Sequence, residues 1–253
     1  PLCPPRPERP PAVRFHRYGG FAGLQRSLAF SARPHVRCTR SGIVLSRAGN
    51  TPKGPLLDDK GQITRDGIRI YQDVDFEGMR VAGRLAAQIL DEIAEHVFPG
   101  QTTGEIDRLI EEKVDAAGAV SATIGYKGYK HASCISINHV VCHGLPGDQK
   151  LKDGDLLNIH VTVIVDGWFG DSSRMYVAGK LSRKAERLIE VTHDSLMLGI
   201  EAVKPGNTFG DIGYAIQSFV EANRMSVVRD FCGHGLGRVF PAPPNGPQHG
   251  RGP

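Results

Sequence analysis

The spacing of apolar residues along this chain predicts both helices and strands. Apolar residues recur at three- and four-residue intervals over 75–97, after residue 105, and over 182–203 and 209–223, so each segment is expected to form a helix with one buried face. Residues 133–177 are expected to form strands. The helix positions expected to face inward are Ala82, Leu85, Ala86, Ile89 and Ile93; Ile106, Leu109, Ile110 and Val114; Ala185, Leu188, Ile189, Thr192, Leu196, Ile200 and Val203; and Ile212, Ala215, Ile216 and Phe219.

A ten-residue segment occurs twice. Residues 97–106 and 203–212 share six identical positions, and each joins a long helix to a shorter one through a Pro-Gly pair. Thr102 and Glu105 have the spacing of a helix-capping box. Common capping chemistry could give part of this likeness, but the shared context favours an internal duplication. We therefore expect two related halves, each with two helices followed by strands.

The alternating segment that follows residue 155 predicts a hairpin with a polar face. Asp166-Gly167 is a strong signal for a two-residue turn. Such a turn places Thr162 opposite Asp171 and puts His160 one diagonal away, on the same face. An imidazole and a carboxylate this close suit a divalent transition metal. The apolar face consists of Leu157, Ile159, Val161, Val163 and Val165, and the polar face of Asn158, His160 and Thr162.

Two further histidines lie in glycine-containing segments. His234 stands between glycines in 232–237, and His143 precedes a glycine in 142–146. Such backbone is tight and exposed. Each histidine taken alone is more readily structural or merely polar, but together with the hairpin they favour a metal site. A nucleotide site at 233–237 is not supported, because the following helix and the distant acidic residue of a dinucleotide fingerprint are missing.

Composition and charge exclude several classes. The chain is 40% hydrophobic and 23% charged, and it has no apolar run of the roughly 20 residues that a membrane-spanning helix needs. Five cysteines without a C-x-x-C pair argue against a disulfide scaffold or a cysteine zinc finger and for a reducing compartment. Residues 1–50 hold nine arginines, one glutamate, no lysine and no aspartate, so the basic character belongs to this arm and does not indicate nucleic-acid binding. We expect residues 1–60 to be a disordered Pro/Arg-rich leader, with an organelle transit peptide as the alternative.

Six motifs then resemble the type I methionine aminopeptidases, of bacterial type, within the pita-bread creatinase/aminopeptidase superfamily. The resemblance covers roughly residues 68–240. It implies an α/β (α+β) fold, a pseudo-twofold duplication around a central antiparallel sheet, in agreement with the repeat. The second half is expected to be incomplete, because residues 241–253 form a Pro/Gly-rich tail and few residues follow the second repeat, so we expect a truncated or corrupted end. The motifs lie at 125–129, 133–138, 141–146, 152–155, 170–173 and 233–237.

The resemblance also implies an activity and a site. The activity is metal-dependent removal of the N-terminal methionine from nascent polypeptides, with two divalent ions (Co, Zn, Mn or Fe). By position, Asp171 is the carboxylate that bridges the ions, His234 is a ligand, and His160 stands in place of an aspartate ligand. His143 is the catalytic histidine, which contacts the substrate amide and helps the tetrahedral intermediate. The methionine pocket comprises Tyr126, Tyr129, Cys134 and Phe240.

The resemblance further implies a cytoplasmic monomer that meets nascent chains and has the ribosome as a second candidate partner, without DNA or membrane binding. A transit peptide in residues 1–50 would instead direct it to a mitochondrion or plastid.

The chain departs from the family pattern at several ligands. His160 replaces an aspartate, Pro241 replaces an expected histidine, and two glutamate ligands would lie beyond residue 253. We therefore predict impaired catalysis, and poor solubility where missing strands leave a core uncovered. The alternatives are a catalytically inactive pita-bread protein that binds nascent chains or the ribosome, and a proline-specific sister peptidase, which the paired tyrosines and the 142–146 segment argue against.

Overall fold

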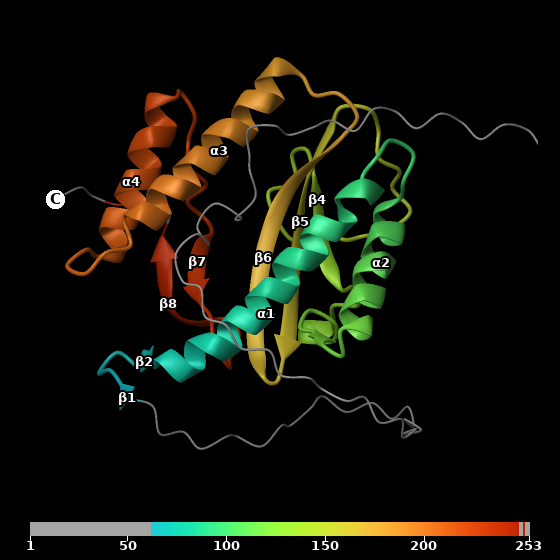
Figure 1. Cartoon of the computed structure of the whole chain (residues 1–253). Coiled ribbons are helices and arrows are strands. Elements are labelled where there is room, and N and C mark those ends of the chain that lie inside the picture. Colours follow the sequence, from blue (N-terminus) through green and yellow to red (C-terminus); the bar gives the residue numbers. More distant parts are fainter. Residues whose placement is uncertain (1–61, 248–249, 251–253) are drawn as a thin grey trace, which may run out of the picture. The chain divides into compact units, whose positions relative to one another are not determined.

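A four-stranded antiparallel sheet is the centre of the folded part of the chain. The computed structural model describes residues 62–247 and 250. In the sheet, β5 (Asp155–Val165) pairs along one edge with β6 (Trp168–Ala178), and along the other edge with β4 (Ser133–Ile137) and β3 (Val120–Ser121) (Figure 1). The register of β5 and β6 places Val165 opposite Trp168 and Thr162 opposite Asp171, as the hairpin turn predicted.

Two helices form the core with this sheet. Helix α1 (Asp73–Glu92) continues as the short 3-10 helix η2 (Ile93–His96) and packs against β5 and β6, while α2 (Thr103–Ala116) contacts β4 (Figure 1). The predicted inward positions of both helices are buried, except that Leu85 and Leu109 are only partly so. On β5, the residues predicted for the apolar face are buried from Leu157 to Val163, and Val165 at the end of the strand is partly buried. The fully buried apolar residues of the sheet and helices include Ala82, Ala86, Ile93, Ile106, Ile110, Leu157, Ile159, Val161 and Val163.

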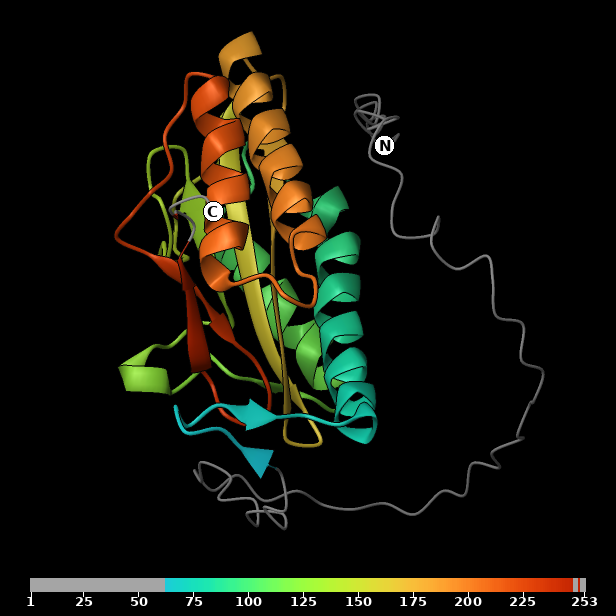
Figure 2. The same cartoon turned by 90° about the vertical axis from the view of Figure 1, so that its left-hand side faces the viewer.

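The repeated segment forms the same structure twice. Thr102 caps α2 with the reciprocal partner Glu105, and Thr208 caps α4 (Phe209–Ala222) with Asp211, so both predicted joints contain a capping box. Helix α3 (Arg183–Glu201) precedes α4 as α1 precedes α2. Helices α3 and α4 lie side by side (Figures 1 and 2).

The face that α3 buries differs from the predicted one. Leu188, Leu196, Ile200 and Val203 were expected inside but are 45–67% exposed. The buried residues of α3 are instead Val191, Ser195 and Gly199. The reason is the contact with α4: a Cβ atom at Gly199 would lie 2.8 Å from Ile216, so the helices meet closely at this glycine.

Residues 138–154 correct a second expectation, since they were predicted as part of a strand region but form a loop between β4 and β5. Asn138 and His143 have positive φ angles there, which interrupt an extended strand. Gly144 lies so close to the backbone of Ile135 that a side chain would not fit. The loop therefore folds back onto β4.

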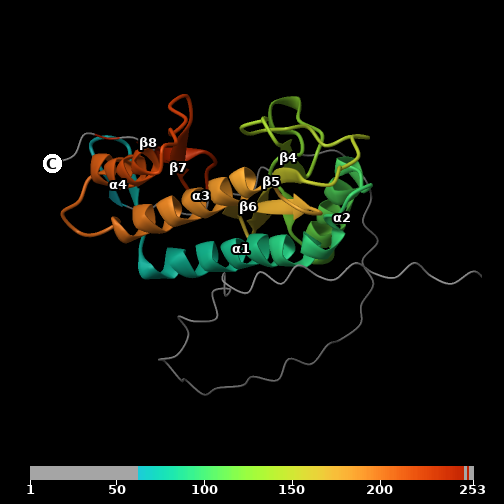
Figure 3. The same ribbon diagram turned by 90° about the horizontal axis from the view of Figure 1, so that it is seen from above.

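The expected Pro/Gly-rich tail contains a strand. β8 (Ala242–Pro247) pairs with β7 (Cys232–Gly235) in a separate two-stranded sheet, and β8 also contacts α4 (Figures 2 and 3). Proline is tolerated there because the sheet has two edge strands and no central one. A short pair, β1 (Gln62–Ile63) and β2 (Arg69–Ile70), precedes α1, and a 3-10 turn, η3 (Tyr126–Gly128), precedes β4.

The predictions for residues 1–60 lie outside the described residues. Within residues 62–247, no helix has both the length and the apolar character required to cross a membrane.

Candidate metal centre and substrate pocket

The three residues predicted as metal ligands, Asp171, His160 and His234, lie together, whereas the predicted catalytic residue His143 lies on a separate loop. Asp171 on β6 is the central one: His160 Nε2 on β5 lies 2.5 Å from its Oδ1 atom, and His234 Nε2 on β7 lies 3.5 Å from its Oδ2 atom. Thr162, directly opposite Asp171 on β5, donates its hydroxyl to Oδ1 at 2.9 Å. The diagonal placement expected from the hairpin turn is therefore observed.

Asp171 is an ionised carboxylate in a largely buried position. Burial raises its pKa, but hydrogen bonds and charge from His160, together with Thr162 and His234, outweigh burial and hold the pKa below its usual 3.8. Only 11% of the Asp171 side chain is exposed. The site thus presents a fixed negative charge between two imidazoles.

Two contacts fix the orientation of the His234 ring. Its Nδ1 atom lies 3.0 Å from the Gly235 carbonyl oxygen, which can only accept, so Nδ1 donates and Nε2 points toward Asp171. The Phe240 ring packs edge-on against His234 at 4.9 Å between centroids. A backbone carbonyl that holds the far nitrogen of a histidine is the usual arrangement behind a metal-ligating imidazole.

The donor set fits a cation on one side of Asp171. His234 Nε2, which carries a lone pair when Nδ1 holds the proton, faces the anionic Oδ2 atom at a spacing wider than a normal hydrogen bond. Among the described residues, however, no group of three or more His, Cys, Asp or Glu side chains is arranged to hold a metal ion. Asp171 and His234 are therefore the pair that offers ligands in this arrangement.

The residues predicted to form the methionine pocket have different surroundings. Cys134 is buried on β4 directly opposite His160 on β5, so this residue lies next to the candidate metal centre. Burial, with the neighbouring Cys134 thiol, raises the pKa of Tyr129, so this phenol stays neutral. Burial likewise raises the pKa of Cys134. Tyr126 is 43% exposed.

His143 and Phe240 have aromatic neighbours. His143 is exposed in the loop after β4, with its ring edge-on to Phe231. Phe240 stacks nearly parallel on Phe169, with centroids 5.5 Å apart. The sequence analysis did not single out Phe169, yet the alternation along β6 already places it on the same face as Asp171.

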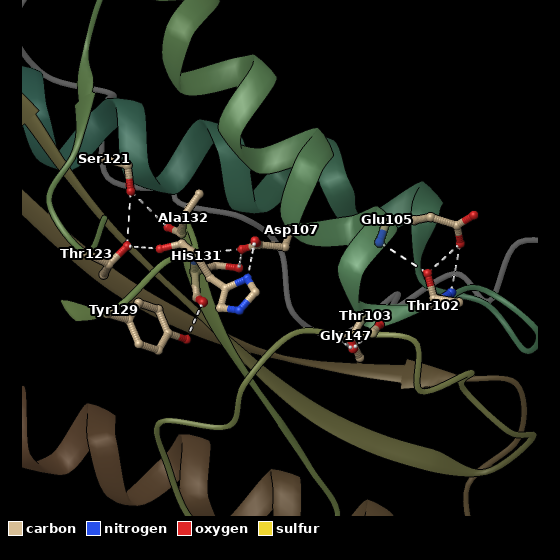
Figure 4. Close-up of polar contacts among 11 residues, drawn as sticks. Thr102, Thr103, Glu105, Asp107, Ser121, Thr123, Tyr129, His131, Ala132 and Gly147 are labelled. Atoms are coloured by element: carbon tan, nitrogen blue, oxygen red, sulfur yellow. Dashed lines mark hydrogen bonds and ion pairs between the residues drawn. The ribbon is translucent and has the colours of Figure 1, made fainter. Parts of the chain in front are cut away.

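A largely buried polar network between α2 and the start of β4 was also missed (Figure 4). Asp107 on α2 accepts hydrogen bonds from the backbone N–H and the hydroxyl of Ser133, at 2.9 and 2.6 Å, and its other oxygen lies 3.2 Å from His131 Nδ1. Tyr129 donates to the Ser133 carbonyl at 2.8 Å. The hydroxyl of Thr123 binds the His131 carbonyl at 2.7 Å. Asp107 thus connects helix α2 to the start of β4 and to the segment 129–131 that precedes it.

Comparison with known proteins identifies the class. Residues 77–252 match the model of metallopeptidase family M24, and the chain belongs to this family. The description of the family denotes peptidases that use a metal ion.

Within the family the similar proteins are methionine aminopeptidases. The chain is 52% identical over 184 residues to the methionine aminopeptidase of Rickettsia prowazekii, a match that covers 73% of this chain and 71% of that protein. It is 54% identical over 175 residues to the enzyme of Escherichia coli, covering 68% of this chain and 66% of that protein. These relatives bear out the predicted activity class, an aminopeptidase that removes N-terminal methionine.

Solved structures agree with the fold. The crystal structure of the Rickettsia prowazekii enzyme superposes with a TM-score of 0.72, covering 73% of this chain and 74% of that chain. Prolidase from Pyrococcus furiosus, at 20% identity, covers 72% of this chain and 53% of that chain with a TM-score of 0.64 and supports the fold alone. The pita-bread architecture expected from the resemblance is confirmed.

Proposed function

We propose that this chain removes methionine from the N-termini of nascent polypeptides through a divalent metal ion held by Asp171 and His234. The observation that carries the proposal is the convergence of these two side chains from separate strands, with Asp171 ionised and His234 oriented by the Gly235 carbonyl. A bound divalent ion supplies a water of lowered pKa and polarises the scissile carbonyl.

The pocket beside this centre gives the selectivity for methionine. Cys134 and the neutral Tyr129 present an apolar and weakly polar wall, which suits an unbranched thioether side chain. Phe240, stacked on Phe169, provides an aromatic ring next to His234, and sulfur–aromatic contacts are favourable. His143, on its exposed loop, is the residue that donates to the substrate amide.

Two features favour a slow enzyme. His160 stands at the position of a ligand carboxylate, and an imidazole brings neither a negative charge nor two oxygens. Pro241 has no ligating side chain. Without a carboxylate at position 160, the site neutralises less of the positive charge of bound metal, so we expect turnover below that of the relatives.

The test is release of free methionine from a Met-Ala-Ser peptide by the full chain with added Zn²⁺, Co²⁺, Mn²⁺ or Fe²⁺. Slow release that stops with the N-acetylated peptide, and that His234→Ala lowers at least about tenfold, supports the proposal. His96, which is exposed on η2, provides the matched control as His96→Ala. Equal release by the parent chain and His234→Ala contradicts it. The alternative of a binding protein without catalysis stays a prediction, which complete absence of release together with saturable peptide binding would favour.

A further inference from the structure

The two oxygens of Asp171 have different surroundings. Oδ1 accepts from His160 Nε2 at 2.5 Å and from the Thr162 hydroxyl at 2.9 Å. A carboxylate oxygen offers about two lone-pair directions, so these two donors fill Oδ1. Oδ2 faces His234 Nε2 at 3.5 Å, beyond the usual N–H···O distance. One oxygen is therefore occupied by the protein itself, and the other is open to a ligand.

The sheet holds this asymmetry in place. His160 and Thr162 are alternate residues of β5 and point to the same face, and Asp171 is paired with Thr162 across the β5–β6 ladder. Thr162 is 2% exposed, and Asp107, on the far side of β4, holds the strand that pairs with His160. Neither donor is on a mobile loop, so neither is expected to withdraw readily from Oδ1.

A hydrogen bond between His160 and Asp171 needs a hydrogen on the histidine nitrogen. The ionised carboxylate can only accept, so Nε2 of His160 is the donor. At 2.5 Å, His160 Nε2 and Oδ1 are in direct contact and lie closer together than two ligands of one tetrahedral ion, which are each about 2.0–2.2 Å from the metal and so about 3 Å or more apart. The 3.5 Å between His234 Nε2 and Oδ2 matches such a pair of ligands. The two histidines beside Asp171 are thus chemically unlike, although sequence analysis grouped both as ligands.

We infer that His160 is a hydrogen-bond donor that closes one oxygen of Asp171, so that the centre holds a single divalent ion, on Asp171 Oδ2 and His234 Nε2, and does not bridge two. The inference rests on the proposed function, since it concerns the same site. His160 acts through Asp171 and is therefore a positioning residue rather than a metal ligand.

Two substitutions at one position separate the two roles. The terminal amide of Gln can donate N–H from about the position of an imidazole Nε2, but it does not replace an imidazole as a metal ligand. If His160 is a donor, His160→Gln keeps the Zn²⁺ affinity within about tenfold of the parent. His160→Ala, which removes the partner of a ligating carboxylate, lowers it about 10- to 100-fold. If His160 is a ligand, both variants lose affinity alike.

The measurement is Zn²⁺ titration of the full chain by isothermal calorimetry, with the site defined as the binding lost in His234→Ala and with His96→Gln as the control. We expect one ion per chain at this site, and retention by His160→Gln. Long-range proton–nitrogen NMR adds a direct readout: on addition of Zn²⁺ the Nε2 resonance of His234 shifts, while His160 keeps its Nε2 hydrogen.

Two results would overturn the inference while leaving the proposed function intact. They are two Zn²⁺ ions lost together in His234→Ala, and equal loss of affinity in His160→Gln and His160→Ala. If instead the parent chain and His234→Ala bind Zn²⁺ identically, the metal site of the proposed function fails, and this inference fails with it.

Discussion

Asp107 is the residue whose removal we expect to be most damaging outside the metal centre. It is 5% exposed and receives two hydrogen bonds from Ser133, which is fully buried. Asp107→Ala leaves the Ser133 N–H and hydroxyl without a partner, at a cost of about 1–3 kcal/mol for each buried group left unsatisfied. Asp107→Asn keeps an acceptor oxygen toward Ser133 and should lose only about 1 kcal/mol.

Urea unfolding of the two variants measures this difference. Asp115→Ala, an exposed position on the same helix, provides the control and should change the free energy of unfolding by less than about 0.5 kcal/mol. Near-ultraviolet circular dichroism reports on Tyr129, which binds the Ser133 carbonyl. Equal stability of Asp107→Ala and the parent would show that the network does not anchor the start of β4.

Glu105 makes part of the stability of α2 dependent on pH. Hydrogen bonds from the Thr102 backbone and hydroxyl hold the pKa of Glu105 below its usual 4.5. The folded state therefore binds this proton less readily than the unfolded state, so the contribution is present above pH 4.5 and disappears as pH falls through the lowered folded pKa. Glu105→Gln should lack this acid-side component.

Thermal unfolding of parent and Glu105→Gln between pH 7 and pH 3 tests the sign. The gap between their melting temperatures should narrow as the solution becomes more acidic. Glu111→Gln, an exposed control on the same helix, should keep a constant gap from the parent. A gap that widens toward low pH would contradict the assignment.

At the scale of elements, one glycine sets how closely α1 approaches the sheet. A Cβ atom at Gly170 on β6 would overlap the backbone of Ala82 and Gly83 on α1. Gly170→Ala must push the helix from the strand, and overpacking of this kind costs about 1–3 kcal/mol. Gly83 offers the opposite case, because a Cβ atom there meets nothing within 4 Å. Gly83→Ala should stabilise the helix by about 0.5–1 kcal/mol.

Chemical denaturation measures the change in the free energy of unfolding for both variants. The same Gly-to-Ala change should lower this free energy at Gly170 and raise it at Gly83. An unaffected Gly170→Ala would show that α1 and β6 are not in close contact at this point. A destabilised Gly83→Ala would show that the space beside Gly83 is not free for a side chain.

Features set by neighbouring residues could be predicted from the sequence, whereas contacts between distant elements could not. The turn at Asp166-Gly167 and the alternation on β5 act over a few residues, so they determined the register and the His160–Asp171 diagonal in advance. The capping boxes are equally local. The Asp107–Ser133 contact joins residues 26 positions apart on different elements, and no periodic signal reports such a pairing. Likewise, the loop 138–154 depends on positive φ angles at non-glycine residues, which apolar spacing does not encode.

The sequence could not predict which face of α3 is buried, for a further reason. Periodicity identifies an apolar stripe on a helix but not whether another element covers it. In α1 the stripe meets β5 and β6. Of the equivalent positions in α3, Val191, Ser195 and Gly199 are buried, and Gly199 lies against α4, but the leucines Leu188 and Leu196 are exposed. The duplication is thus visible in the sequence, while the unequal packing of its two copies depends on the tertiary structure.

At the scale of the whole molecule, this inequality predicts self-association. Leu188, Leu196 and Ile200 on α3, together with Val203 just after its end, form an exposed apolar stripe, and exposed patches of this kind promote association. The repeat supplies a matched test, because Leu90 and Leu196 are separated by the repeat offset and so occupy equivalent positions. Leu90 is 1% exposed and Leu196 is 55% exposed.

Leu196→Lys should leave the free energy of unfolding within about 0.5 kcal/mol of the parent, because the position already faces water, and it should reduce the fraction of large species in sedimentation velocity. Leu90→Lys buries a charge among apolar residues and should prevent folding, since truncation of such a leucine to alanine alone costs about 2–5 kcal/mol. Leu90→Ala keeps the comparison quantitative if the lysine variant cannot be purified. Equal destabilisation at the two equivalent positions would mean that α3 is covered as α1 is, and that the duplicated halves pack alike.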